Sequence, residues 1–242
     1  KLTGVTALAD PDVAFDVTLD VSIAADTVTT GAGNDTFVWD GGAHIVTMGK
    51  GDDKVTVDDT ATGGTMAFGA GDADELISSH DSADITGTTI SGLEKITLQS
   101  GKDVVILEAQ GSAFAAIDNF TIVGAGGTNT VTVEALGSAS TADLSGITMT
   151  NVDAVAFNPD TAADSIKGTT ANDSFTYIDE VTLTGTLDGH TGTDTLVIDT
   201  NSMDISGGTI TGFESVTIKD SQTLTMTAAQ VNSIVTSISA TT

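Results

Sequence analysis

Two ladders of residues with a period of nine constrain the fold of this chain more than any other feature. The first ladder is acidic or polar and the second, two positions later, is apolar: Asp26, Asp35, His44 and Asp53, then Val28, Phe37, Val46 and Val55. Two nine-residue segments make one coil of eighteen residues, so Asp35 and Asp53 fall on the same edge of successive coils. Stacked strands lie about 4.8 Å apart, which brings carboxylates on one edge close enough to share a cation.

A second period of about sixty residues divides the chain into repeated units. Three segments share one pattern: SADITGTTISGLEKITL (82–98), TADLSGITMTNVDAVAF (141–157) and SMDISGGTITGFESVTI (202–218). A shift of 120 residues also carries Asp53 onto Asp173 and Asp74 onto Asp194. The sequence therefore predicts a tandem of units, each containing several short strands.

Short runs rich in β-branched residues alternate with turn residues along the chain. Examples are VTVDD, KITL, TVTV and TLVID, separated by Gly, Asn, Asp, Ser and Thr. Together with the nine-residue period, this pattern predicts an all-β fold, a right-handed parallel β-roll or β-helix solenoid. Only TAAQVNSIV (227–235) indicates a helical turn. The predicted organisation is an N-terminal strand or cap (1–22), a β-roll unit (23–98), a degenerate β-helix unit (99–157), a second β-roll unit (158–218) and a C-terminal cap (219–242).

The charge balance restricts the partners. Asp and Glu total 34 against 7 Lys and Arg, which gives a net charge of −27. Nucleic acids and anionic membranes need basic patches, so neither is expected as a partner, whereas a metal cation is the natural counter-charge. An apolar content of 39% argues against disorder. The absence of cysteine excludes disulfides and Cys-based zinc sites, and no run of about 18 apolar residues predicts a transmembrane segment.

The turns combine the residue types that a calcium ion needs. TGAGNDTFV (30–38) and MGKGDDKVT (48–56) both read Gly-x-Gly-x-Asp-x-apolar, and FGAGDADEL (68–76), GTTANDSFT (168–176) and GHTGTDTLV (189–197) are weaker matches. Glycine adopts φ > 0 and lets a turn aim its carbonyls inward, while aspartate adds the charge. Calcium takes 6–8 oxygen ligands from carboxylates and carbonyls. The predicted metal-binding residues are Gly31, Gly33, Asp35, Gly49, Gly51, Asp53, Gly69, Gly71, Asp72, Asp74, Asp164, Gly168, Asp173, Gly189, Gly192, Asp194 and Asp26.

These turns resemble the G-G-x-G-x-D-x-U-x nonapeptide of RTX proteins, which bind Ca²⁺ in a parallel β-roll. The first glycine is replaced by Thr30 or Met48, and the second by Ala171 in the turn before Asp173. With its G-[LF]-E-x-[IV]-x-[LI] segments, the chain is similar to bacterial surface-layer proteins and RTX-type adhesins. The resemblance implies secretion by a type I exporter, calcium-driven folding at the cell surface, and assembly of copies of the chain into a homo-oligomer or two-dimensional lattice.

Glu94, Asp153 and Glu214 occupy one position of the sixty-residue pattern. No glycine pair accompanies them, so a structural role is expected in preference to metal binding. A carboxylate at that position can hold a turn through backbone N–H groups or cap the neighbouring unit.

Several function classes remain after these observations. An enzyme is not expected, because the three histidines are mutually distant, Tyr177 and Trp39 are the only residues of their kinds, and no His-Glu-x-x-His or Gly-x-Ser-x-Gly motif occurs. His44 is expected to fill a coil edge that lacks calcium. A structural, self-assembling surface protein is the first hypothesis. The alternatives are an adhesin stalk or carbohydrate-recognition module, with a cell-surface polysaccharide as partner, and the noncatalytic β-roll of a larger secreted enzyme.

Overall fold

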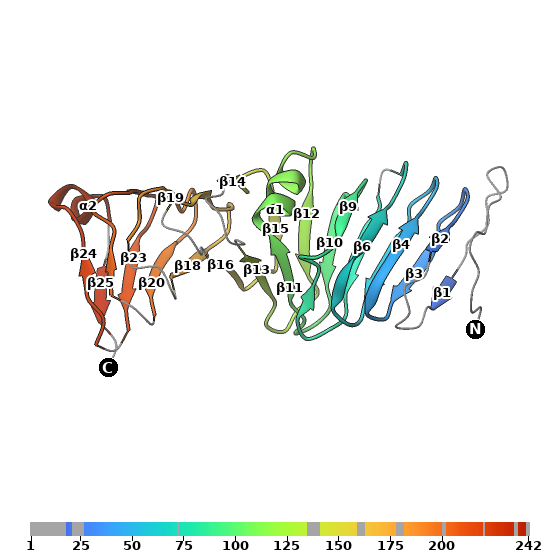
Figure 1. Cartoon of the computed structure of the whole chain (residues 1–242), viewed down its shortest axis with the longest axis horizontal. Helices are drawn as coiled ribbons and strands as arrows, with labels where there is room; N and C mark the ends of the chain where they lie inside the picture. Colours follow the sequence, from blue (N-terminus) through green and yellow to red (C-terminus); the bar gives the residue numbers. More distant parts are fainter. Residues whose placement is uncertain are drawn as a thin grey trace. The chain divides into compact units, whose positions relative to one another are not determined.

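The computed structural model describes residues 18–20, 27–71, 73–134, 141–158, 163–177, 182–199, 202–219, 221–234 and 237–240. In these residues the fold is all-β, with parallel strands stacked as a β-solenoid and two short helices (Figure 1). The predicted fold class is confirmed. The chain divides into two compact units, unit 1 (residues 1–106 and 120–129) and unit 2 (residues 107–119 and 130–242).

Unit 1 is built on two parallel sheets that alternate along the chain. The first contains, in order, β1 (Thr18–Asp20), β3 (Thr36–Trp39), β5 (Lys54–Val57), β7 (Glu75–Ser78), β10 (Lys95–Leu98) and β12 (Thr121–Gly124). The second contains β2 (Thr27–Thr29), β4 (Gly42–Thr47), β6 (Ala61–Ala67) and β9 (Thr89–Ser91). The short strand β8 (Ala83–Asp84) pairs with β11 (Val104–Leu107). Each of the four coils from β1 to β9 therefore contributes one strand to each of these two sheets.

Unit 2 repeats this plan. One sheet contains β13 (Thr130–Glu134), β16 (Ala154–Asn158), β18 (Asp173–Tyr177), β20 (Thr195–Ile198), β23 (Ser215–Ile218) and β25 (Ser237–Ala240). The other contains β14 (Thr141–Asp143), β17 (Ser165–Lys167), β19 (Thr186–Asp188) and β22 (Thr209–Thr211). β21 (Met203–Asp204) pairs with β24 (Leu224–Thr225), and β15 (Thr148–Thr150) also belongs to this unit.

The core is a stack of apolar rungs at matching positions of successive coils. Phe37 pairs with Val55, and Val28 pairs with Val46, as the eighteen-residue coil requires. All four side chains are buried, because alternate residues of a strand face the same side. The apolar nine-residue ladder is therefore the inner lining of unit 1, and the prediction that these residues stack is confirmed.

His44 departs from the prediction. It lies inside β4, not at a coil edge, and its side chain is fully buried. Its ring centroid is 4.9 Å from that of Trp39 and 6.0 Å from that of Phe37, with edge-on geometry to both. The expected position is wrong because β4 begins two residues earlier, at Gly42, so position 44 is an inward-facing strand residue.

Two helices interrupt the strands, and the sequence predicted one of them. α2 (Ala228–Ser233) lies in the expected segment 227–235, whereas α1 (Glu108–Ala115) was not expected. Both begin with the same device, in which a glutamine side chain accepts the backbone N–H three residues before it: Leu107 N–H to Gln110 Oε1 at 2.8 Å and Thr227 N–H to Gln230 Oε1 at 2.7 Å. The 120-residue shift superimposes the two glutamines, and this was the signal that would have predicted α1.

Candidate metal-binding turns

Three glycine-rich turns of unit 1 stack on one another where β2, β4 and β6 lead into β3, β5 and β7. The inter-strand ladder continues through them. Gly33 N–H donates to Lys50 O at 2.8 Å, and Ala70 N–H donates to Gly49 O at 2.9 Å. The turns are therefore part of the regular solenoid and not loops that project from it.

Close stacking explains the glycines independently of any metal. A Cβ added at Gly49 would overlap the carbonyl oxygen of Gly31, and a Cβ at Gly51 would overlap that of Gly33. Gly51 also has φ +120°, a conformation that side-chain-bearing residues rarely adopt. The close contact between successive turns, which leaves no room for a Cβ, is therefore enough to explain the Gly-x-Gly spacing.

The aspartates that end these turns form a hydrogen-bonded ladder, called here the unit 1 row (Asp35, Asp53 and Asp74). The backbone N–H of Asp35 donates to Asp53 Oδ1 at 2.8 Å, and that of Asp53 donates to Asp74 Oδ1 at 2.7 Å. Glu94 ends the row, because its Oε2 accepts the Asp74 N–H at 2.9 Å. The three aspartates are buried. One edge of unit 1 therefore carries carboxylates on four successive coils.

Unit 2 contains a shorter ladder of the same design, called the unit 2 row (Asp173 and Asp194). Asp173 N–H donates to Asp194 Oδ1 at 2.8 Å, and Asp194 N–H donates to Glu214 Oε2 at 2.7 Å. The shift of 120 residues relates every member of this ladder to one in unit 1. The hydrogen bonds made by Glu94 and Glu214 are those expected of a structural carboxylate that holds a turn.

Burial raises the pKa of four row aspartates, Asp53, Asp74, Asp173 and Asp194. For Asp53 the pKa rises to about 7 and for Asp74 to about 6, first because of desolvation and further because of neighbouring carboxylates. Asp194 is similarly raised to about 6, chiefly by burial. The Oδ2 atoms of Asp53, Asp74 and Asp194 are buried and accept no hydrogen bond in the described part of the chain. Each row thus presents buried carboxylate oxygens that lack a compensating donor.

Asp173 is the exception within the rows. Thr169 donates its backbone N–H to Asp173 Oδ2 at 2.7 Å and its hydroxyl to Asp173 Oδ1 at 2.8 Å. Thr169 is itself fully buried, and it lies in the turn where Ala171 replaces the second glycine. Both oxygens of Asp173 are therefore satisfied by the protein. The sequence did not single out Thr169, although its position four residues before Asp173 in an imperfect glycine turn is a readable signal.

The remaining predicted ligands are distributed unevenly. Gly69 and Gly71 belong to the third turn of unit 1, and Gly189 and Gly192 to the turn before Asp194. Asp164 is buried but precedes β17, in the connection opposite to that of Asp173. Asp26 and Asp72 lie outside the described residues. No three Asp, Glu, His or Cys side chains of the described residues gather as a metal-binding group, so a cation there would need backbone carbonyls for most of its ligands.

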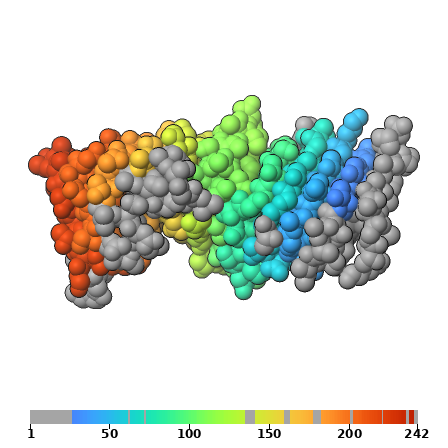
Figure 2. Space-filling model, in the orientation of Figure 1, coloured from blue at the N-terminus to red at the C-terminus, as the bar shows by residue number. Residues whose placement is uncertain are grey.

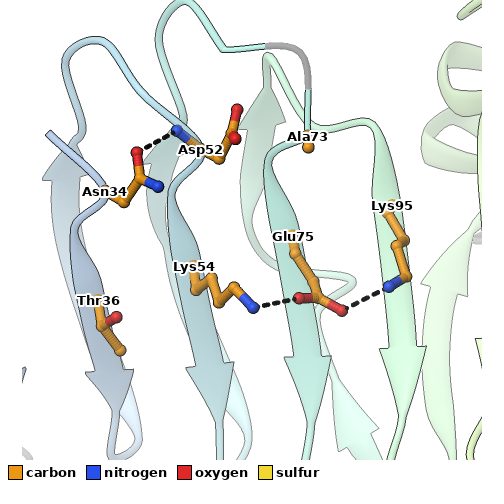
Figure 3. Close-up of a pocket in the computed structure, with 7 residues that line it drawn as sticks. All are labelled: Asn34, Thr36, Asp52, Lys54, Ala73, Glu75 and Lys95. Atoms are coloured by element: carbon orange, nitrogen blue, oxygen red, sulfur yellow. Dashed lines mark hydrogen bonds and ion pairs between the residues drawn. The ribbon is translucent and has the colours of Figure 1, made fainter.

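A polar groove of about 410 Å³ lies on the outer face of the unit 1 sheet that contains β3, β5, β7 and β10, next to the turns (Figure 3). Its lining residues are Asn34, Thr36, Asp52, Lys54, Ala73, Glu75 and Lys95. Glu75 Oε2 is 3.0 Å from Lys54 Nζ, and Glu75 Oε1 is 2.9 Å from Lys95 Nζ. Burial alone would raise the pKa of Glu75, but hydrogen bonds from Thr97 and both lysines lower it to about 2. The groove therefore holds an ion-paired cluster across three strands.

Figure 2 shows one face of the chain as a space-filling view, coloured along the sequence. Among the residues that the structure describes, no helix is long and apolar enough to cross a membrane. Comparison with protein-family models, with curated proteins and with solved structures finds no match to this chain.

Proposed function

We propose that this chain is a calcium-binding structural segment of an extracellular, self-assembling surface protein. The observation that carries the proposal is the set of buried Oδ2 atoms of Asp53, Asp74 and Asp194 that accept no hydrogen bond. Leaving a buried carboxylate oxygen without a partner is costly, and a cation placed against it removes that cost. Carbonyl oxygens lie near two of these carboxylates: a Cβ added at Gly71 would meet both Gly51 O and Asp74 Oδ2, and one added at Gly189 would meet both Gly212 O and Asp194 Oδ2.

The donor chemistry favours calcium over other metals. The turns contain carboxylate and carbonyl oxygens and no thiolate, and the one imidazole in the described part of these turns is that of His190, before Asp194. Hard oxygen donors in an irregular arrangement suit calcium, which accepts 6–8 ligands at variable geometry. Magnesium demands near-ideal octahedral geometry and retains its waters, so a closely stacked turn suits it less well.

Calcium binding would couple to folding and to assembly. A ligand that binds only the folded chain adds RT ln(1 + [L]/Kd) of stability for each site. Each bound Ca²⁺ also reduces by two the net charge of −27, which repels one copy from another. Together with the resemblance to surface-layer and RTX proteins, this supports a chain that leaves the cell through a type I exporter and then assembles with its own kind in a lattice.

The groove of Figure 3 supports a second candidate function, a binding module of the adhesin type. Its hydroxyl, amide, carboxylate and ammonium groups match the mixed donors and acceptors of a polysaccharide. Specific retention of the chain on a cell-surface polysaccharide would favour this candidate, whereas reversible sheets formed by the chain alone would favour the lattice. A noncatalytic role within a larger secreted enzyme is compatible with the same calcium chemistry.

The test is far-UV circular dichroism combined with analytical ultracentrifugation on the chelated chain, titrated with Ca²⁺ or Mg²⁺. The proposal predicts a cooperative gain of β signal that is selective for calcium and is followed by larger species. A chelated chain that is already folded and does not respond to calcium would contradict it.

A further inference from the structure

The turns that end at Glu94 and Glu214 are shorter than those that end at aspartate. Only Gly92–Glu94, three residues, connects β9 to β10, whereas residues 68–74 connect β6 to β7. In unit 2, Gly212–Glu214 connects β22 to β23, and the six residues Gly189–Asp194 connect β19 to β20. The same contrast therefore occurs twice, 120 residues apart.

The short turns use one backbone conformation and one stacking contact. Gly92 and Gly212 both have φ +71°. A Cβ added at Gly92 would lie 3.1 Å from the backbone N of Gly69, and one added at Gly212 would lie 2.8 Å from the backbone N of His190 and 3.2 Å from that of Gly189. Each short turn therefore stacks on the start of the preceding aspartate turn.

The residue before the carboxylate separates the two kinds of turn. Before glutamate it is apolar and almost completely buried: Leu93 and Phe213 are each 1% exposed. Before aspartate it is exposed, as at Asn34, Asp52, Ala73 and Thr193. Phe213 also packs edge-on against Phe175 with ring centroids 5.1 Å apart. An apolar side chain directed into the core closes the short turn, and three residues provide too few carbonyls to surround a cation.

The longer glutamate side chain compensates for the shorter turn. Its additional methylene group lets the carboxylate reach the backbone N–H of the last aspartate, at 2.9 Å from Asp74 in unit 1 and 2.7 Å from Asp194 in unit 2. These distances are typical of charge-assisted hydrogen bonds. The glutamate thus makes the same hydrogen bond as a row aspartate, but from a turn that lacks the glycine pair.

We propose that Glu94 and Glu214 are metal-free end caps of the two carboxylate rows. Each cap satisfies the N–H of the last aspartate and ends the series of cation positions at Asp74 and at Asp194. The part of this inference that concerns cation number rests on the proposed calcium function, whereas the hydrogen-bond role does not. The position at which glutamate with a buried apolar neighbour replaces aspartate then sets how many cations a unit holds.

The test compares three variants of the full chain, E94Q/E214Q, E94A/E214A and D74N, with D194N as a second aspartate variant. Calcium number is measured by isothermal titration calorimetry, and stability by thermal unfolding. Glutamine retains an acceptor oxygen, so E94Q/E214Q should keep the wild-type number of bound ions and unfold within about 2 °C of wild type. E94A/E214A should bind the same number but unfold about 3–8 °C lower, since two buried N–H groups lose their acceptor. D74N should lose an ion.

Two results would overturn the inference. If E94Q/E214Q lost ions as the aspartate variants do, the glutamates would be ligands and not caps. If the alanine and glutamine variants unfolded at the same temperature, the hydrogen bonds would not hold the turns. A wild-type chain that binds no calcium would refute the proposed function alone, because the difference in unfolding temperature between the alanine and glutamine variants can still be measured.

Discussion

The unit 1 and unit 2 rows share one hydrogen-bond pattern, and they differ at Asp173, because Asp194 of unit 2 keeps a buried Oδ2 that accepts no hydrogen bond, as Asp53 and Asp74 do. In unit 1 the row consists of three aspartates behind glycine-rich turns, and Asp53 and Asp74 each keep a buried oxygen that accepts no hydrogen bond. In unit 2 the first aspartate, Asp173, has both oxygens occupied by Thr169. Under the proposed calcium function, a stacked carboxylate does not by itself make a metal position. The rest of the turn must also leave its second oxygen without a hydrogen-bond donor.

The largest expected effect distinguishes the two rows by calcium affinity. Replacing Asp53 and Asp74 by asparagine (D53N/D74N) removes two charged oxygen ligands and should weaken calcium binding by about tenfold or more. D173N, at a carboxylate that the protein already satisfies, should change calcium binding by less than about threefold. Isothermal titration calorimetry measures both. Equal losses in the two variants would remove the distinction between the rows.

A measurement of stability tests the hydrogen bond from the Thr169 hydroxyl to the Asp173 carboxylate. T169V keeps the side-chain volume but removes the hydroxyl, leaving Asp173 Oδ1 buried without this donor, and it should cost about 1–3 kcal/mol of unfolding free energy. The adjacent Thr170 is exposed, so T170V is a matched control and should change stability by less than about 0.5 kcal/mol. Chemical denaturation in the presence of calcium measures both. A T169V chain as stable as T170V would show that Thr169 does not hold the carboxylate.

The raised pKa values predict how the calcium-free chain responds to pH. The folded-state pKa of Asp53 is about 7 and that of Asp74 about 6, above the ordinary value of 3.8. The folded chain therefore binds protons more tightly than the unfolded chain, so this contribution to stability is complete below pH about 4 and is lost as the pH rises through 6 to 7. Calcium-free chain should unfold at a higher temperature at pH 5 than at pH 8.

Calcium affinity should change in the opposite sense over the same window, because protons and calcium compete for the same oxygens. It should increase from pH 5.5 to pH 7.5. D53N/D74N should show a smaller change with pH in both measurements. A calcium-free chain whose unfolding temperature rises from pH 5 to pH 8 would mean that these carboxylates are ionised without a cation.

The smallest expected effect concerns the outer faces of the two units. In unit 1, Glu75 forms ion pairs with Lys54 and Lys95. The equivalent positions of unit 2, 120 residues later, are Ser174, Thr195 and Ser215. Ion pairs between half-exposed lysines and a carboxylate contribute little, so K54Q should cost less than about 1 kcal/mol. Denaturation at low and high salt measures this contribution. A larger, salt-independent loss would show that the cluster is essential to unit 1 and not interchangeable with the hydroxyl row of unit 2.

The solenoid could be predicted because its signal is periodic. Each coil places one apolar residue at the same inward position, so the pairing of Phe37 with Val55 follows from the spacing alone. The position of Asp53 one coil after Asp35 follows for the same reason, whereas Asp74 lies 21 residues after Asp53 and departs from the eighteen-residue period. Repetition multiplies a weak local pattern until it specifies both the fold and the row.

Features that occur at one place, or that depend on local register, could not be predicted in this way. His44 matches the spacing of the acidic ladder, but a strand that starts at Gly42 turns its side chain into the core. The position of Thr169 four residues before Asp173 marks a candidate, but the hydrogen bond depends on where its hydroxyl points after folding. The helix α1 could not be predicted from a local pattern. Under the 120-residue shift, only Ala109 and Gln110 are identical to the residues at the same positions of α2.

Under the proposed function, cations bind beside the unit 1 row, whereas at Asp173 the backbone N–H and hydroxyl of Thr169 take the place of a cation. Crystals of the chain grown with a lanthanide in place of calcium would test it most directly, because anomalous scattering locates each ion. We expect anomalous-scattering peaks beside the Oδ2 atoms of Asp53 and Asp74 and none beside Asp173. A unit 1 row without peaks, or a peak at Asp173 with Thr169 displaced, would contradict it.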